Sequence, residues 1–121
     1  MLNLDTHILI FALEDSLSPK ERKLLEKESW GISAIVLWEL AKLSELGRIE
    51  MDLEDSEVLR ALSKLHVWPI DLDVCRALKK LDFKSDPADE LTAATSLLHK
   101  IPLLTRDRKI KRSKRVPLAK S

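Results

Sequence analysis

The sequence predicts an α/β fold, a three-layer α/β/α sandwich with a mostly parallel sheet between two layers of helices. The main observation is that short apolar runs alternate with helical segments along the chain, which requires crossover connections between parallel strands. The length of 121 residues and the apolar content of 45% fit one domain, residues 1–121, with one core. In such sheets, sites form outside the carboxyl ends of the strands.

The first half of the chain is predicted from its apolar runs and its helix-start residues. An apolar run at 1–4 forms a strand that Asp5 ends. Ser18 and Pro19 have the chemistry of a helix N-cap and first position, and Gly47 is typical of the residue after a helix. The predicted elements are a strand at 1–4, helices at 6–13 and 20–28, a strand at 29–33 and a helix at 34–46.

The second half continues this alternation. Leucines and a valine at helical spacing predict a helix at 52–66. A strand follows at 67–70, and the proline within it favours an edge position. The remaining predicted elements are helices at 72–81 and from Pro87 to about Lys100, and strands at 101–105 and 116–118.

The cellular setting is predicted from features that the sequence lacks. It has no run of 18 apolar residues, so we expect no membrane span, and its first residues do not resemble a signal peptide. We therefore expect a cytoplasmic protein. Cys75 is the only cysteine, and its apolar helical surroundings predict a buried thiol rather than a nucleophile.

The helix that begins at Pro87 opens among three acids. Pro87 suits the first helical position, so Asp86 falls at the N-cap, where it can accept a bond from a free N–H. Asp89 then lies in the first turn. In one interpretation Asp89 completes a capping box by bonding back to the N-cap N–H. In the other it points into a pocket and holds a metal ion.

The helix at 34–46 carries a carboxylate within its apolar stripe. At about 100° per residue, Ile35 and Leu43 lie about 40° to either side of Glu39. A lone carboxylate in that position costs several kcal/mol to desolvate unless another group compensates it. A buried ion pair, or a helix end less buried than the stripe implies, would also explain the pattern.

Asp5 and Asp107 each follow a predicted parallel strand, so both lie at the edge of the sheet where ligands bind. Either could be a helix cap. If Glu39 and Asp89 meet them there, four carboxylates repel one another, which favours raised pKa values or a hard divalent cation such as Mg²⁺ or Mn²⁺.

Other kinds of site find no support. The histidines are scattered, so no cluster has zinc-ligand spacing. The only glycines are Gly31 and Gly47, too few for a phosphate-binding glycine-rich loop.

From Arg106 onward there are eight Lys or Arg residues and one acid, Asp107. This excess of positive charge favours a polyanion partner, unless this end is simply a solvated tail. Acids for a metal beside cations for phosphates suit a metal-dependent phosphodiesterase.

Four motifs together resemble the PIN domain, and more narrowly the VapC toxins of toxin–antitoxin pairs. Each motif is weak alone, but their order and spacing are specific, and they span nearly the whole chain. They are Leu4-Asp5-Thr6; Ser33 with Trp38-Glu39-Leu40 and Leu46-Gly47-Arg48-Ile49; Asp86-Pro87-Ala88-Asp89 with Leu91 and Ala93-Ala94-Thr95; and Leu104-Thr105-Arg106-Asp107.

The resemblance implies about five parallel strands in the order 3-2-1-4-5 and an Mg²⁺- or Mn²⁺-dependent endoribonuclease. It implies a catalytic and metal-binding set consisting of Asp5, Glu39, Asp89 and Asp107, with Asp86 left to capping. Thr6 and Thr105 would orient carboxylates or water. It also implies a homodimer and a small antitoxin that blocks the site. The exposed apolar residues expected on the helix at 34–46, Leu37 and Trp38, agree with a protein contact.

We expect Arg106, Arg108 and Lys109 to contact RNA phosphates. Glu90 and Thr92 depart from the family pattern, which commonly has Arg and an apolar residue there, so the substrate preference is open. Two alternative interpretations remain. In the first, the chain is a non-catalytic RNA- or protein-binding module on the same fold. In the second, its acidic site hydrolyses DNA or a phosphate monoester.

Overall fold

The computed structural model describes residues 1–120 and contains a four-stranded parallel sheet in the order β3-β2-β1-β4. Its strands are β1 (Leu2–Leu4), β2 (Trp30–Ser33), β3 (His66–Trp68) and β4 (Leu103–Leu104). The fold class and the order of these strands are as predicted. The predicted fifth strand is a single parallel bridge between Leu103 and Leu118, because β4 has only two residues to pair with.

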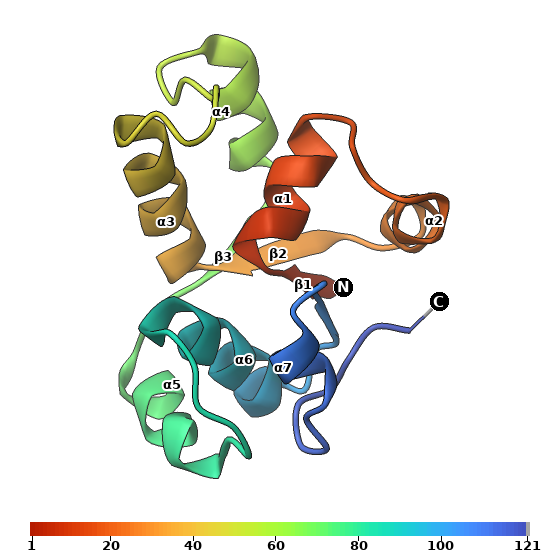
Figure 1. Ribbon diagram of the computed structural model, residues 1–121, viewed down its shortest axis with the longest axis vertical. Helices are drawn as coiled ribbons and strands as arrows, with labels where there is room; N and C mark the ends of the chain where they lie inside the picture. Colours follow the sequence, from red (N-terminus) through yellow and green to blue (C-terminus); the bar gives the residue numbers. More distant parts are fainter. Residues whose placement is uncertain (121) are drawn as a thin grey trace.

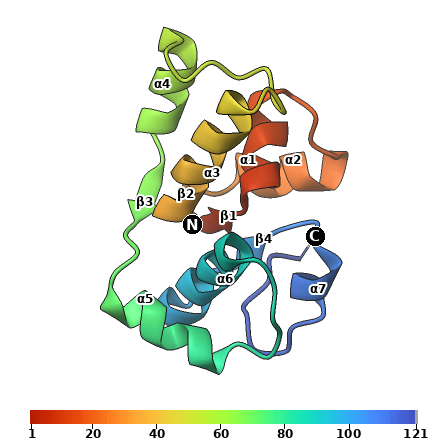
Figure 2. The same cartoon turned by 60° about the vertical axis from the view of Figure 1, so that its left-hand side comes forward.

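Helices cover both faces of this sheet (Figure 1). One side carries α1 (Thr6–Leu13), α2 (Pro19–Glu26), α3 (Ala34–Glu45) and α4 (Ser56–Ser63). The other carries α5 (Leu72–Ala77), the short 3₁₀ helix η1 (Leu78–Lys80), α6 (Pro87–His99) and α7 (Arg108–Lys111). The turned view in Figure 2 shows the same two layers.

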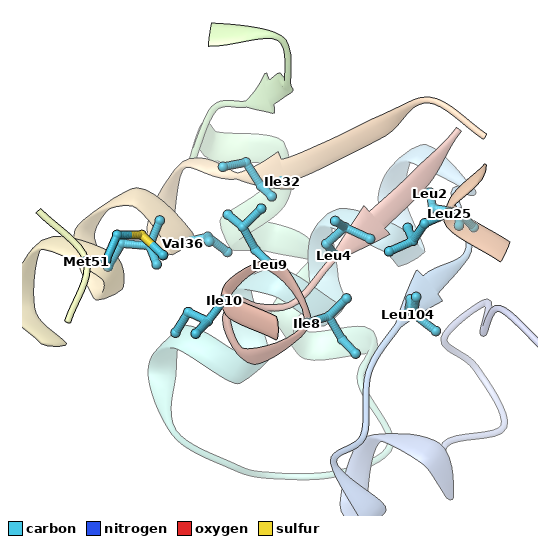
Figure 3. Packing of buried hydrophobic residues seen from close by; sticks show 11 residues of the cluster. Leu2, Leu4, Ile8, Leu9, Ile10, Leu25, Ile32, Val36, Met51 and Leu104 are labelled. Atoms are coloured by element: carbon cyan, nitrogen blue, oxygen red, sulfur yellow. The ribbon is translucent and has the colours of Figure 1, made fainter. Parts of the chain in front are cut away.

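The larger core lies between the sheet and α1 and α3. Figure 3 shows Ile8 and Leu9 of α1 packed among side chains of the strands and of α3. Both residues are fully buried. On the opposite face the buried side chain of Asn3 donates hydrogen bonds to the Thr92 carbonyl and the Ser96 hydroxyl, so β1 is tied directly to α6. These contacts fix α1, α3 and α6 relative to the end of β1.

The helix ends follow from local hydrogen bonding. Ser18 and Glu21 form a complete capping box at the start of α2, and Gly47 after α3 has a positive φ, as predicted. The start predicted for α4 was wrong. Asp52 accepts a bond from the Glu54 N–H within a turn, and Asp55 is the N-cap, so the helix begins at Ser56.

The structure also corrects the prediction made for Cys75. Cys75 is exposed, so the prediction of a buried thiol was wrong: α5 buries Val74 and Ala77 and turns Cys75 to solvent. Within residues 1–120, every helix is too short or too polar to cross a bilayer.

Candidate active site at the carboxyl edge of the sheet

Asp5 is held between two elements that are far apart in the sequence. It ends β1 and is the N-cap of α1, where its Oδ1 accepts a bond of 2.9 Å from the Ile8 N–H. Its Oδ2 accepts a bond from the hydroxyl of Thr105, just beyond β4. Burial raises the pKa of Asp5 although both bonds lower it. The carboxylate is therefore positioned at a desolvation cost that its neighbours do not remove.

Glu39 projects from α3 toward the same edge. Its Oε1 accepts a bond from the hydroxyl of Thr6, the first residue of α1. The residue is half-buried, and the pKa of Glu39 is raised first by this burial and then by the negative charges of Asp89 and Asp5. The helical wheel places Glu39 at the centre of the apolar stripe, but the buried residues of α3 are Val36 and Leu40, and Glu39 is only half-buried. A hydroxyl rather than an ion pair holds its carboxylate.

Asp89 lies in the first turn of α6, and its Oδ2 accepts a bond of 2.9 Å from the Ser85 hydroxyl. The capping interpretation was wrong in two respects. The acid that reaches back to a backbone N–H is Glu90, which accepts from Ser85. Asp86 occupies the N-cap position, but its side chain makes no capping bond. No side chain caps the start of α6: Glu90 bonds to the N–H of Ser85, one residue before the N-cap, and Asp89 bonds to the Ser85 hydroxyl.

Asp107 completes the set as the N-cap of α7. Its Oδ1 accepts a bond of 3.0 Å from the Ile110 N–H, and its own N–H donates to the Thr105 hydroxyl oxygen. Thr105 therefore links two acids, since it donates to Asp5 and accepts from Asp107. Both threonines that the family resemblance singled out, Thr6 and Thr105, contact acids of the set.

The four acids are close enough to affect one another electrostatically. Burial is the main cause of the raised pKa of Asp89, and the charges of Asp107 and Asp86 raise it further. The charge of Asp89 in turn raises the pKa of Asp5 and of Glu39. The charge of Asp89 therefore interacts with each of the other three carboxylates, and Asp5 also raises the pKa of Glu39 directly.

The donor set fits a hard divalent cation in its chemistry, because it consists only of carboxylate oxygens beside hydroxyl groups. Within residues 1–120, however, no three His, Cys, Asp or Glu side chains have the spacing of an assembled metal centre. In this structure, hydroxyl groups or backbone N–H groups donate to an oxygen of each of the four carboxylates.

Arg106 adjoins the set but is already engaged. Its guanidinium donates to both carboxylate oxygens of Glu21 at 2.7 and 2.8 Å and lies 4.0 Å from the centre of the Phe11 ring. The bond to Arg106 lowers the pKa of Glu21 to about 2. Arg108 and Lys109 are exposed and form no ion pair within residues 1–120.

Sequence reasoning missed three contributors to this edge. Ser85 holds Asp89, and its place just before the Asp-Pro helix start was the signal for it. The charge of His7 lowers the pKa of Asp5, Glu39 and Asp89, and its position two residues after Asp5 could have indicated this. The Glu21 partner of Arg106 is 85 residues away and left no local signal.

A hollow of about 390 Å³ opens beside Glu39. It is lined by Ile35 and Trp38 of α3 and by Asp86, Pro87 and Ala88 at the start of α6. Trp38 is 56% exposed. The acids therefore stand next to an apolar surface that a planar group could cover.

A parallel sheet with four carboxylates at its carboxyl edge defines an α/β protein with a polar site suited to cation chemistry. A family model described as PIN domain matches residues 3–116. The chain belongs to the PIN domain family, and its fold is that of the VapC-like members.

Solved structures with the same fold agree. The chain is 20% identical to a chain of VapBC2 from Rickettsia felis bound to a promoter DNA fragment, with a TM-score of 0.74 and 98% of each chain covered. For FitAcB from Neisseria gonorrhoeae the identity is 20%, the TM-score 0.71, and the coverage 99% of this chain and 97% of the other. For DNA-bound VapBC from Salmonella typhimurium the identity is 21% and the TM-score 0.69, and the coverage is 98% of this chain and 96% of the other. No curated protein matches the sequence.

Proposed function

We propose that this PIN domain is a metal-dependent endoribonuclease and the toxin of a toxin–antitoxin pair. The observation that supports the proposal is that Asp5, Glu39, Asp89 and Asp107 are linked by interactions between their charges, with the pKa of the first three raised mainly by burial. Carboxylates held at such a cost are typical of functional sites rather than of structural ones. The named neighbours are toxin–antitoxin complexes, which supports the second part of the proposal.

In this proposal the four acids hold Mg²⁺ or Mn²⁺. A cation held in this way supplies a nucleophilic water at neutral pH and stabilises charge on a phosphoryl oxygen. The residues around it have separate tasks. Thr105 keeps Asp5 in place, Thr6 keeps Glu39 in place, and Ser85 does the same for Asp89. Each bond fixes one carboxylate rotamer, so less freedom is lost when the cation and substrate bind.

The proposed partners are RNA, a small antitoxin protein and a second copy of this chain. Leu37 and Trp38 on the outer face of α3 are 37% and 56% exposed, which supports a protein contact at that helix. We also propose a cytoplasmic setting, where RNA is available.

The test is to incubate the purified protein with single-stranded RNA in Mn²⁺ or Mg²⁺, with and without EDTA. The proposal expects RNA cleavage that EDTA abolishes. Retention of RNA without cleavage in either metal would favour the non-catalytic binding module. Parallel incubations with DNA and with a small phosphate monoester separate an RNase from a DNA nuclease or a phosphatase.

A further inference from the structure

Two segments of the chain carry a large excess of positive charge. Residues 76–84 and 108–115 together contain one acid, Asp82. They contain ten basic residues: Arg76, Lys79, Lys80, Lys84, Arg108, Lys109, Lys111, Arg112, Lys114 and Arg115. The net charge of the whole chain is only +1, so the remainder is acidic and the charge is strongly polarised.

The fold brings these two segments side by side. Asp82 accepts bonds from the Ser113 hydroxyl and from the Lys114 N–H, the latter at 2.8 Å. The Arg115 guanidinium donates to the Lys80 carbonyl at 3.1 Å. Both segments lie at the end of the molecule opposite α4 (Figure 1 and Figure 2). We call the ten basic residues of the two segments the basic surface.

The cations of the basic surface form no ion pair within residues 1–120, although Arg115 is near enough to Asp82 for their charges to attract. None of the four ion pairs within residues 1–120 involves one of its ten cations. Its single acid, Asp82, is occupied in joining the two segments. Arg106 differs, because Glu21 holds it in a two-point ion pair. Attraction for a polyanion therefore comes from the basic surface rather than from Arg106.

A hollow of about 410 Å³ gives part of this surface a concave shape. Arg76, Lys79 and Lys80 line it, and Asp73 is the one acid in its lining. Three cations around one hollow favour an anionic group such as a phosphate.

The basic surface adjoins the candidate active site at two points. Lys84 directly precedes Ser85, which holds Asp89. Arg108 directly follows Asp107, the N-cap of α7. Along the chain, each segment therefore has one end next to a residue that belongs to the acidic set or holds a member of it.

We propose that the basic surface binds the phosphate backbone of single-stranded RNA and leads one of its phosphates to the acids. The proposal rests on the proposed function for the identity of the polyanion. A flexible single strand can follow both segments and bend toward the acids, and repeated phosphates match cations spaced along them.

The experiment measures binding of a short fluorescent single-stranded RNA in EDTA, so that no cleavage occurs, over a range of salt concentrations. Lys79→Gln with Lys80→Gln should weaken binding and reduce the slope of log affinity against log salt by about 1.4, or about 0.7 for each lost phosphate contact. Lys79→Arg with Lys80→Arg should keep the wild-type slope, because the charge remains.

The matched control is Arg60→Gln with Lys64→Gln at α4, which removes two exposed charges at the other end of the molecule. It should leave the slope unchanged, and an equal loss in this control would overturn the proposal. So would wild-type slope and affinity in the Lys79 and Lys80 glutamine variant, or wild-type protein that binds polyglutamate but not RNA. Because the assay needs no cleavage, an inactive protein that still shows the predicted slopes refutes the proposed function alone.

Discussion

The carboxylate cluster and the Arg106–Glu21 pair are neighbours with opposite electrostatics. Asp5 and Glu39 are held by neutral hydroxyls, and burial raises the pKa of each. Glu21 is held by a guanidinium, which lowers its pKa to about 2. A structural acid is thus bonded to a counter-charge, whereas the acids of the cluster form no ion pair within residues 1–120 and have only the unbonded charge of His7 nearby. The difference supports the proposal that the cluster binds a cation.

The largest effect should come from neutralising one member of the cluster. Asp5→Asn keeps the shape and an acceptor for the Ile8 N–H but removes a charge. RNA cleavage should fall by at least about 10²–10³-fold, the size seen when one group of a preorganised site is removed. The thermal unfolding temperature should not fall. Wild-type cleavage by well-folded Asp5→Asn protein would remove Asp5 from the mechanism.

A smaller loss should follow when a holding hydroxyl is removed. Thr105→Val leaves Asp5 without its O–H donor and the Asp107 N–H without its acceptor. Activity should fall about 10–100-fold, as is usual for groups that orient ligating carboxylates. Thr105→Ser restores the hydroxyl and should recover most of it. If the serine variant is as slow as the valine variant, the hydroxyl is not what matters.

Sequence alone located the acids better than the groups that hold them. Asp5 and Asp107 were predictable because strand ends in a parallel sheet share an edge, and Glu39 because its helix period placed a charge in an apolar stripe. The capping bonds predicted at the start of α6 are not formed, because Asp89 and Glu90 both bond to Ser85 and the Asp86 side chain makes no capping bond. The partner of Arg106 lies on α2, and only tertiary packing decides such a contact.

Removing the charge of Asp89 from the carboxylate cluster should stabilise the fold. The folded-state pKa of Asp89 is raised, so its ionisation destabilises the fold as pH rises through that pKa, and the cost disappears below its unfolded value of 3.8. Asp89→Asn should therefore raise the unfolding temperature by a few degrees at pH 7 and lose that advantage as the pH falls toward 3.8. Thermal unfolding at several pH values measures it. If Asp89→Asn is less stable than wild type at pH 7, the ionised Asp89 side chain does not destabilise the fold.

Breaking the Glu21–Arg106 ion pair should lower the stability of the fold, and this should be the smallest of the expected effects. The folded-state pKa of Glu21, about 2, is below its unfolded value of 4.5, so the pair's contribution is present above 4.5 and lost as pH falls through 2. Arg106 is 41% exposed, so solvent screening limits the contribution to about 1 kcal/mol.

Glu21→Gln and Arg106→Gln should each cost about that much at pH 7, and the double variant no more than either one. Chemical denaturation of the three variants and the wild type forms the cycle. Additive losses would show that the two side chains act separately and would free Arg106 to serve as a phosphate contact.

In the proposed function, acids that are distant in the sequence form a single cation site. Titration of Mn²⁺ into the protein, followed by the electron paramagnetic resonance of the free ion, tests it directly. Wild-type protein should remove Mn²⁺ from solution, and Asp5→Asn, Glu39→Gln and Asp89→Asn should each weaken that binding strongly. Mn²⁺ binding of wild-type strength in all three variants would contradict the claim.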